Sequence, residues 1–158
     1  MAEPRDFFAA VNEIYAFEAL DVEALRKVYR VERVGETFYE KLAAKLENPD
    51  AVDLLLRNAR EERGHAERVR RAIGKKLGRD YEPAGADLET FPIPLPEKVT
   101  PELFEGIVAG EIAGDAGYQK WADRESDPEV QKLLRQNGRE EIVHSERAAR
   151  VLAILRAP

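Results

Sequence analysis

The chain contains one stretch twice, AREERGHAER at residues 59–68 and GREEIVHSER at residues 138–147. In each copy a Glu precedes a His by three residues, and these are the only two histidines in the chain. Residues three apart on a helix project from nearly the same face, so each pair can present a carboxylate and an imidazole to one ion. The two pairs are Glu62 with His65 and Glu141 with His144.

The same offset of 79 residues aligns much more of the chain. Without a gap, 17 of the 54 positions from 21 to 74 are identical to their counterparts, where about three or four are expected from average residue usage. This agreement indicates an internal duplication. Other identical pairs are Glu32 with Glu111, Gly35 with Gly114, Tyr39 with Tyr118 and Asn58 with Asn137.

Composition excludes several classes of protein. A formal net charge of −6, with 35% charged residues of both signs, describes a solvated acidic protein, so nucleic acid is not an expected partner. The absence of cysteine excludes disulfides, thiolate nucleophiles, iron–sulfur clusters and cysteine-based zinc sites. No segment approaches the roughly 18–20 apolar residues of a membrane span. We therefore expect a single cytoplasmic domain over residues 1–158, with no membrane partner.

Helix start signals recur in both halves and predict two hairpins of long helices. Asp21 and Thr100 are suited to cap the first helix of each hairpin. Asn48 and Asp127, each followed by proline, are suited to begin the second helix. The first helix is expected to run to about Glu47. The predicted hairpins span residues 21–77 and 100–156.

Residues 78–99 join the hairpins and contain several prolines, which exclude regular helix and favour an extended strap. At about 3.1 Å per residue this strap can exceed 60 Å, more than the roughly 40 Å length of one long helix. A connection of this length suits a crossover along the whole bundle. Residues 1–20 are expected to be an N-terminal helical extension that packs on the bundle, contacts a second subunit or docks onto a larger assembly. The predicted fold is an all-α bundle of four long helices.

The helix spacing brings the acidic residues to one level. Glu32 lies 16 residues before the turn at Asn48 and Glu62 lies 14 after it, which is about 24 Å and 21 Å along two antiparallel helices. Glu111 and Glu141 have the same spacing around the second turn. Burying four carboxylates is severely unfavourable without compensation, and two divalent cations supply it. Carboxylates with one imidazole per ion suit iron or manganese better than zinc.

One Glu on each of two helices, with Glu-x-x-His on each of the other two, resembles the ferritin-like di-iron carboxylate superfamily. The Glu-x-x-Gly with a downstream Tyr, as in Glu32, Gly35 and Tyr39, is similar to its rubrerythrin branch. The resemblance covers residues 20–155 and implies a ferritin-like four-helix bundle with two iron ions, or manganese or a mixed pair. It implies Glu62 and Glu141 as the bridging ligands. The full implied ligand set is Glu32, Glu62, His65, Glu111, Glu141 and His144.

The chain departs from the rubrerythrin pattern in two ways. Rubrerythrins commonly have a seventh ligand, a Glu three residues after the carboxylate of the third helix, where this chain has Gly114. Many also carry a rubredoxin-type domain whose iron is held by four cysteines, and this chain has no cysteine. The resemblance therefore implies two nearly symmetric metal positions and a separate electron donor.

Three further pairs of residues are candidates for contacts with the ligands: Tyr39 and Tyr118, Glu36 and Asp115, and Asn58 and Asn137. The tyrosines either hydrogen-bond ligand carboxylates across the bundle or are ordinary core residues. The acidic pair either receives the free imidazole N–H or lies exposed, and the asparagines are expected to face inward. Gly35 and Gly114 are expected to permit close approach of helices near the ions. Arg68 and Arg147 are predicted to form surface ion pairs.

The sequence favours an oxidoreductase in which a di-iron pair reduces O2 or hydrogen peroxide, as a peroxidase or a ferroxidase. Iron binding or storage without a dedicated substrate is an alternative, and so is hydroxylation of an organic substrate. A metal-free helical interaction module would leave four buried carboxylates unexplained. The expected partners are O2 or hydrogen peroxide, a separate electron donor and a second copy of the chain in a homodimer.

Overall fold

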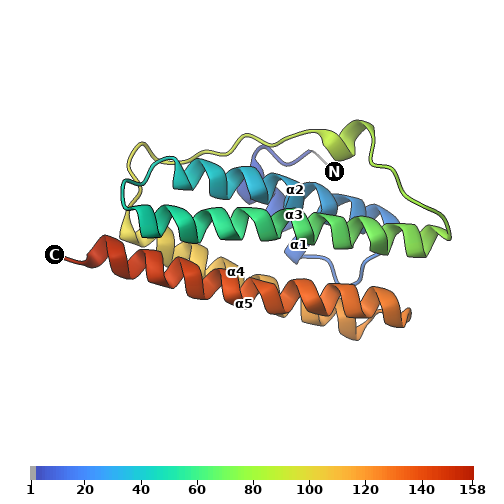
Figure 1. The fold of residues 1–158 in the computed structure, drawn as a ribbon. Coiled ribbons are helices and arrows are strands. Elements are labelled where there is room, and N and C mark those ends of the chain that lie inside the picture. Colours follow the sequence, from blue (N-terminus) through green and yellow to red (C-terminus); the bar gives the residue numbers. More distant parts are fainter. Residues whose placement is uncertain (1–2) are drawn as a thin grey trace.

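The structure is a computed structural model that describes residues 3–158, and four long helices form a bundle in it (Figure 1). The helices α2 and α3 form one hairpin, α4 and α5 form the other, and α3 packs against α5. The predicted all-α bundle with a short N-terminal helix is confirmed. Within residues 3–158, no helix has both the length and the apolar character needed to cross a membrane. The helices are α1 (Phe7–Tyr15), α2 (Val22–Ala43), α3 (Pro49–Leu77), α4 (Pro101–Asp123) and α5 (Pro128–Arg156).

Each long helix begins at a side chain that accepts hydrogen bonds from free N–H groups of the first turn. These N-cap residues are the four expected ones, Asp21, Asn48, Thr100 and Asp127. The end of α2 differs from the prediction, because the helix stops at Ala43 and not at about Glu47. The N–H groups of Lys45 and Leu46 bond to carbonyls three residues back, and this tighter pattern ends the α-helix.

The crossover runs along the hairpin of α2 and α3, from the end of α3 to the start of α4 (Figure 1). It begins at Gly78, whose φ of 66° lies in the left-handed region that favours glycine after a helix. It contains a short 3-10 turn, η1 (Gly85–Leu88). Asp87 in this turn accepts a hydrogen bond of 2.9 Å from Arg26 of α2 and another from the Tyr81 hydroxyl. This buried carboxylate fastens the crossover to α2.

The helix α1 packs on the bundle beside α2, which is one of the three expected positions. Its residues Phe7 and Ile14 are buried. The backbone N–H of Phe7 donates to the carbonyl of Pro92 in the crossover at 2.9 Å. Beyond the helix, the carbonyl of Phe17 accepts a hydrogen bond of 2.8 Å from the indole of Trp121 in α4. The extension is therefore tied to the bundle at both ends.

Candidate metal centre

Near the middle of the bundle, all four long helices direct acidic or imidazole side chains inward. The two histidines are fully buried. The side chain of Glu111 is 13% exposed, against 7% for each of the other three carboxylates, so the centre is most open on the α4 side. The six residues are those implied by the sequence: Glu32, Glu62, His65, Glu111, Glu141 and His144.

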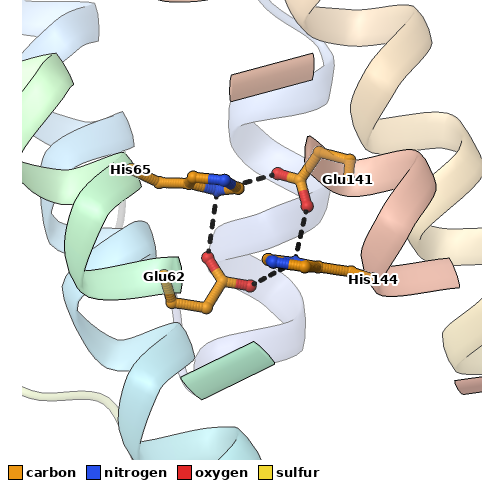
Figure 2. A group of neighbouring side chains, drawn as sticks. All are labelled: Glu62, His65, Glu141 and His144. Atoms are coloured by element: carbon orange, nitrogen blue, oxygen red, sulfur yellow. Dashed lines mark ion pairs between the residues drawn. The ribbon is translucent and has the colours of Figure 1, made fainter. Parts of the chain in front are cut away.

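Glu62 and Glu141 each lie between the two imidazole rings (Figure 2). The rings are stacked with their centroids 5.0 Å apart and their planes at 16°. One oxygen of Glu62 lies 3.4 Å from Nδ1 of His65, and the other lies 3.4 Å from Nδ1 of His144. The two oxygens of Glu141 make the same pair of approaches at 3.5 Å and 3.3 Å. Each of these carboxylates thus faces both halves of the centre.

Glu32 and Glu111 each face a single imidazole. An oxygen of Glu32 lies 3.4 Å from Nδ1 of His65, and an oxygen of Glu111 lies 3.8 Å from Nδ1 of His144. Each half of the centre therefore has one His and one Glu of its own and shares Glu62 with the other half. Glu141 is shared in the same way.

The donor atoms of this cluster fit a pair of divalent ions. Nδ1 of His65, Nδ1 of His144 and one oxygen of Glu141 are buried without a hydrogen-bond partner among the described residues. Unpaired polar atoms are unfavourable inside a protein, and imidazole with carboxylate is a ligand set for iron or manganese. Glu62 joins these three residues in a group whose ligand atoms all lie within 4.8 Å of one another.

Burial raises the pKa of all four carboxylates, but for two of them contacts with the imidazoles have the larger, opposite effect. It raises the pKa of Glu32 to about 8 and, together with repulsion from Glu141, raises that of Glu111 well above its ordinary value. Burial also opposes ionisation of Glu62 and Glu141, but contacts with the two imidazoles outweigh it and lower both pKa values. The two shared carboxylates therefore remain ionised, while Glu32 and Glu111 hold protons at neutral pH.

The imidazoles are held in their charged form by the same carboxylates. Burial would lower the pKa of His65, but Glu141 and the surrounding acidic groups raise it well above its ordinary value. The pKa of His144 is raised to about 12, because its contacts with carboxylates again outweigh burial. Two imidazolium groups then balance two carboxylates.

A second pair of glutamates binds the outer nitrogen of each imidazole. Nε2 of His65 lies 3.1 Å from Glu140, and Nε2 of His144 lies 3.0 Å from Glu61. Burial opposes the ionisation of both glutamates, but their contacts with His and Arg lower each pKa to about 2. A charged acceptor at Nε2 keeps the N–H there when the ring gives up its other proton, so that Nδ1 is the nitrogen that becomes free as a ligand. Sequence analysis did not single out these two residues, although they are identical at the 79-residue offset.

Of the two alternatives for Glu36 and Asp115, the structure does not support the one in which they receive the imidazole N–H. Glu36 accepts hydrogen bonds from Arg63, and Asp115 accepts one of 2.9 Å from Gln119. The histidines lie on α3 and α5, which pack against each other. The nearest acid to each ring is therefore on the facing helix and not on α2 or α4.

The asparagines complete this arrangement between α3 and α5. Arg147 donates to Glu61 at 2.6 Å and to the side-chain oxygen of Asn58 at 3.0 Å, and the Asn58 amide donates to the carbonyl of His144 at 3.2 Å. The other half repeats these contacts with Arg68, Glu140, Asn137 and His65. The two arginines form ion pairs as predicted, but these pairs are largely buried between the helices, because the arginine side chains are only 15% and 17% exposed.

The two tyrosines connect α2 with α4 across the centre. The hydroxyl of Tyr39 in α2 donates to Glu111 in α4, and the hydroxyl of Tyr118 in α4 donates to Glu32 in α2. Both rings are buried, and burial together with the accepting carboxylate raises the pKa of each hydroxyl. Each hydroxyl therefore stays protonated and remains a donor to its carboxylate.

Side chains from neighbouring elements pack tightly against the glycines near the centre. A Cβ at Gly35 would lie 3.2 Å from the carboxyl carbon of Glu62. A Cβ at Gly114 would lie 3.0 Å from the hydroxyl oxygen of Tyr15 and 3.4 Å from Cγ of Glu141. Tyr15 comes from α1 and has no counterpart in the repeat, so the sequence carried no signal for it. Burial and nearby carboxylates raise the pKa of its hydroxyl, which stays protonated.

A four-helix bundle with these carboxylates and Glu-x-x-His pairs in its core defines the ferritin-like di-iron carboxylate class. The family model described as Rubrerythrin matches residues 23–152, so the chain belongs to the rubrerythrin family. Searches of the curated proteins and of the solved structures found no match. The family and the buried group of Glu and His together point to a site for two metal ions.

Proposed function

We propose that this protein is an oxidoreductase that reduces O2 or hydrogen peroxide at a pair of iron ions. The observation that carries the proposal is the position of Glu62 and Glu141, each with one oxygen toward each imidazole. In the proposed site these two residues bridge the ions, while Glu32 with His65 and Glu111 with His144 complete the two positions. Iron supplies the electrons for the reaction when it is bound, and manganese or a mixed pair is the alternative.

The surrounding residues orient the side chains of this site. Tyr39 orients the carboxylate of Glu111 from the opposite helix. Glu61 keeps the proton of His144 on Nε2, so that Nδ1 remains a ligand atom. The hydroxyl of Tyr15 lies beside Gly114 and remains protonated, so it is available there as a hydrogen-bond donor.

The missing carboxylate at Gly114 bears on the choice of oxidant. The two halves of the centre are nearly symmetric, and the Tyr15 hydroxyl occupies the space beside Gly114. We therefore propose less preference for hydrogen peroxide over O2 than in a rubrerythrin with seven ligands, as in a ferroxidase.

The proposal includes partners for the reaction. This chain has no cysteine for a rubredoxin-type iron site, so a separate donor supplies electrons. A homodimer is proposed as the assembly, supported by an exposed apolar face of α4 that includes Ala109, Ile112 and Ala113. The cytoplasm is the proposed compartment.

Anaerobic titration with ferrous iron, followed by stopped-flow oxidation, tests this function. We expect saturation at two ions per chain and repeated turnover with O2 or hydrogen peroxide when a reductant is present. Glu62→Ala should impair both ions, whereas His65→Ala should weaken mainly one. Saturation at one ion would contradict the paired site, and a single oxidation without turnover would favour iron storage.

A further inference from the structure

A cavity of about 390 Å³ lies beside the metal centre, between α1, α2 and α4. All four carboxylates of the centre line it, together with Tyr15 and Tyr39. Its other walls are mostly aromatic and aliphatic. They include Phe8, Val11 and Ile14 of α1, Val31 and Phe38 of α2, and Ile107 of α4. The cavity therefore joins an apolar chamber to the polar centre.

Two glycines of α4 create space in this chamber. Gly106 and Gly110 line the cavity, and a Cβ at either position would meet no heavy atom within 4 Å. Neither has a positive φ, so no backbone conformation requires glycine there. The counterpart of Gly110 in the first half is Val31, which lines the opposite wall. Both glycines lie at exposed positions, so they form part of the solvent-facing mouth of the cavity, and the absence of side chains there leaves this mouth open.

The size and the charge of the chamber define what it can hold. An engineered cavity of roughly 150 Å³ binds one benzene, so this volume accommodates a molecule of about ten to fifteen carbon atoms. O2 and hydrogen peroxide need far less space and no apolar wall. Every charged residue on the lining is a glutamate, including Glu102 at the exposed end. The lining therefore offers no cationic side chain to pair with an anionic ligand.

We propose that this cavity binds a neutral, elongated, apolar organic molecule of about ten carbon atoms, with one end against the carboxylates of the metal centre. The walls alone provide the affinity. The proposal rests on the proposed function only for any reaction at the inner end, because binding itself requires no metal.

Calorimetric titration of the full-length protein with straight-chain 1-alkanols of increasing length tests the binding. The affinity should rise about fourfold for each added CH2 group and should stop rising near ten to twelve carbons, where the chamber is filled. Decanoate should bind more weakly than 1-decanol to the metal-free protein, because its charge would be buried in an apolar chamber whose lining has no cationic side chain. No saturable binding of any alcohol, or equal affinity for decanoate and decanol, would overturn the proposal.

Substitutions on α4 locate the bound molecule. Gly110→Leu and Gly106→Leu place a bulky side chain at the mouth of the cavity, where a Cβ meets no clash, and each should weaken 1-decanol binding by about tenfold or more. The matched control is Ala149→Leu, which adds the same side chain at an exposed position of α5 that does not line the cavity, and it should leave binding within about twofold. Equal losses in the control and in the glycine variants would overturn the assignment to this cavity.

Metal and alcohol titrations of the unmodified protein and of Gly110→Leu distinguish this proposal from the proposed function. Gly110→Leu should still bind two metal ions, since the substituted residue is not one of the six proposed ligands. If the unmodified protein binds 1-decanol but fails to bind two ions, the proposed function falls and the apolar site stands. If it binds two ions but no alcohol, the apolar site falls alone.

Discussion

Loading two divalent metal ions should release about four protons per chain at pH 7. In the metal-free protein, Glu32 and Glu111 are protonated, and His65 and His144 are charged, because their pKa values are raised. Two ions bring a charge of +4, so four protons must leave if the buried centre is to stay neutral. Glu62 and Glu141 release no protons, because their lowered pKa values mean that they are already ionised.

The pH dependence follows from the same assignments. The pKa of Glu32 is about 8, so this residue loses its proton as pH rises through 8, and the release should fall to about three near pH 9. Metal affinity should rise with pH over the same range, because fewer protons have to be displaced. The variant Glu32→Gln should release one proton fewer than the unmodified protein at pH 7. Glu36→Gln is the control, because Glu36 contacts Arg63 outside the centre.

Calorimetry in buffers of different ionisation enthalpy measures the proton count directly, with anaerobic ferrous iron or manganese as the metal. A release of about one proton or fewer at pH 7 would refute the reasoning. It would mean that the carboxylates are already ionised and solvated, and that the imidazoles are neutral before metal binds.

Three further predictions concern single residues. Glu140→Gln removes the charged partner of His65 and should weaken metal binding about 10- to 100-fold in a metal titration, with no change counting against the positioning role. Asp87→Asn should lower the free energy of unfolding by about 2 kcal/mol in urea at pH 7. Burial raises the pKa of Asp87, but its hydrogen bonds outweigh burial and lower the pKa overall. The stability difference between the two proteins should therefore shrink below about pH 4, where Asp87 becomes protonated, and a difference that stays constant with pH would contradict this prediction. Gly114→Glu should raise the preference for hydrogen peroxide over O2 in stopped-flow oxidation, provided that the Tyr15 side chain moves aside. The double variant Gly114→Glu with Tyr15→Ala removes this obstacle. An unchanged preference in the double variant would show that the missing carboxylate does not set the choice of oxidant.

Much of the architecture could be predicted because its signals are local. Helix caps such as Asn48 and Asp127 act within one turn, so they can be recognised without knowledge of the fold. Helix geometry converts the spacing of Glu32 and Glu62 around a turn into a common height, which places these residues at one level before any packing is known. The end of α2 was misjudged because a terminal turn depends on weak competition between hydrogen-bond patterns.

The partners of the imidazoles could not be derived in the same way. Glu36 lies one helical turn beyond Glu32, and a local argument made it a candidate. The structure instead pairs His144 with Glu61 on the facing helix, since α3 packs against α5. The identity of Glu61 and Glu140 across the repeat was a usable signal, but spacing along one helix does not reveal which helix lies opposite.

The sequence by itself determined the helical hairpins, the common level of the acidic residues and the Glu-x-x-His pairs, since all of these follow from the regular geometry of single helices and of turns. Only the tertiary structure decided which imidazole nitrogen faces inward, that Tyr15 fills the space beside Gly114, and that a cavity opens onto the carboxylates. These features depend on contacts between segments far apart in the chain. Such contacts are set by the packing of whole helices, and no local sequence pattern records them.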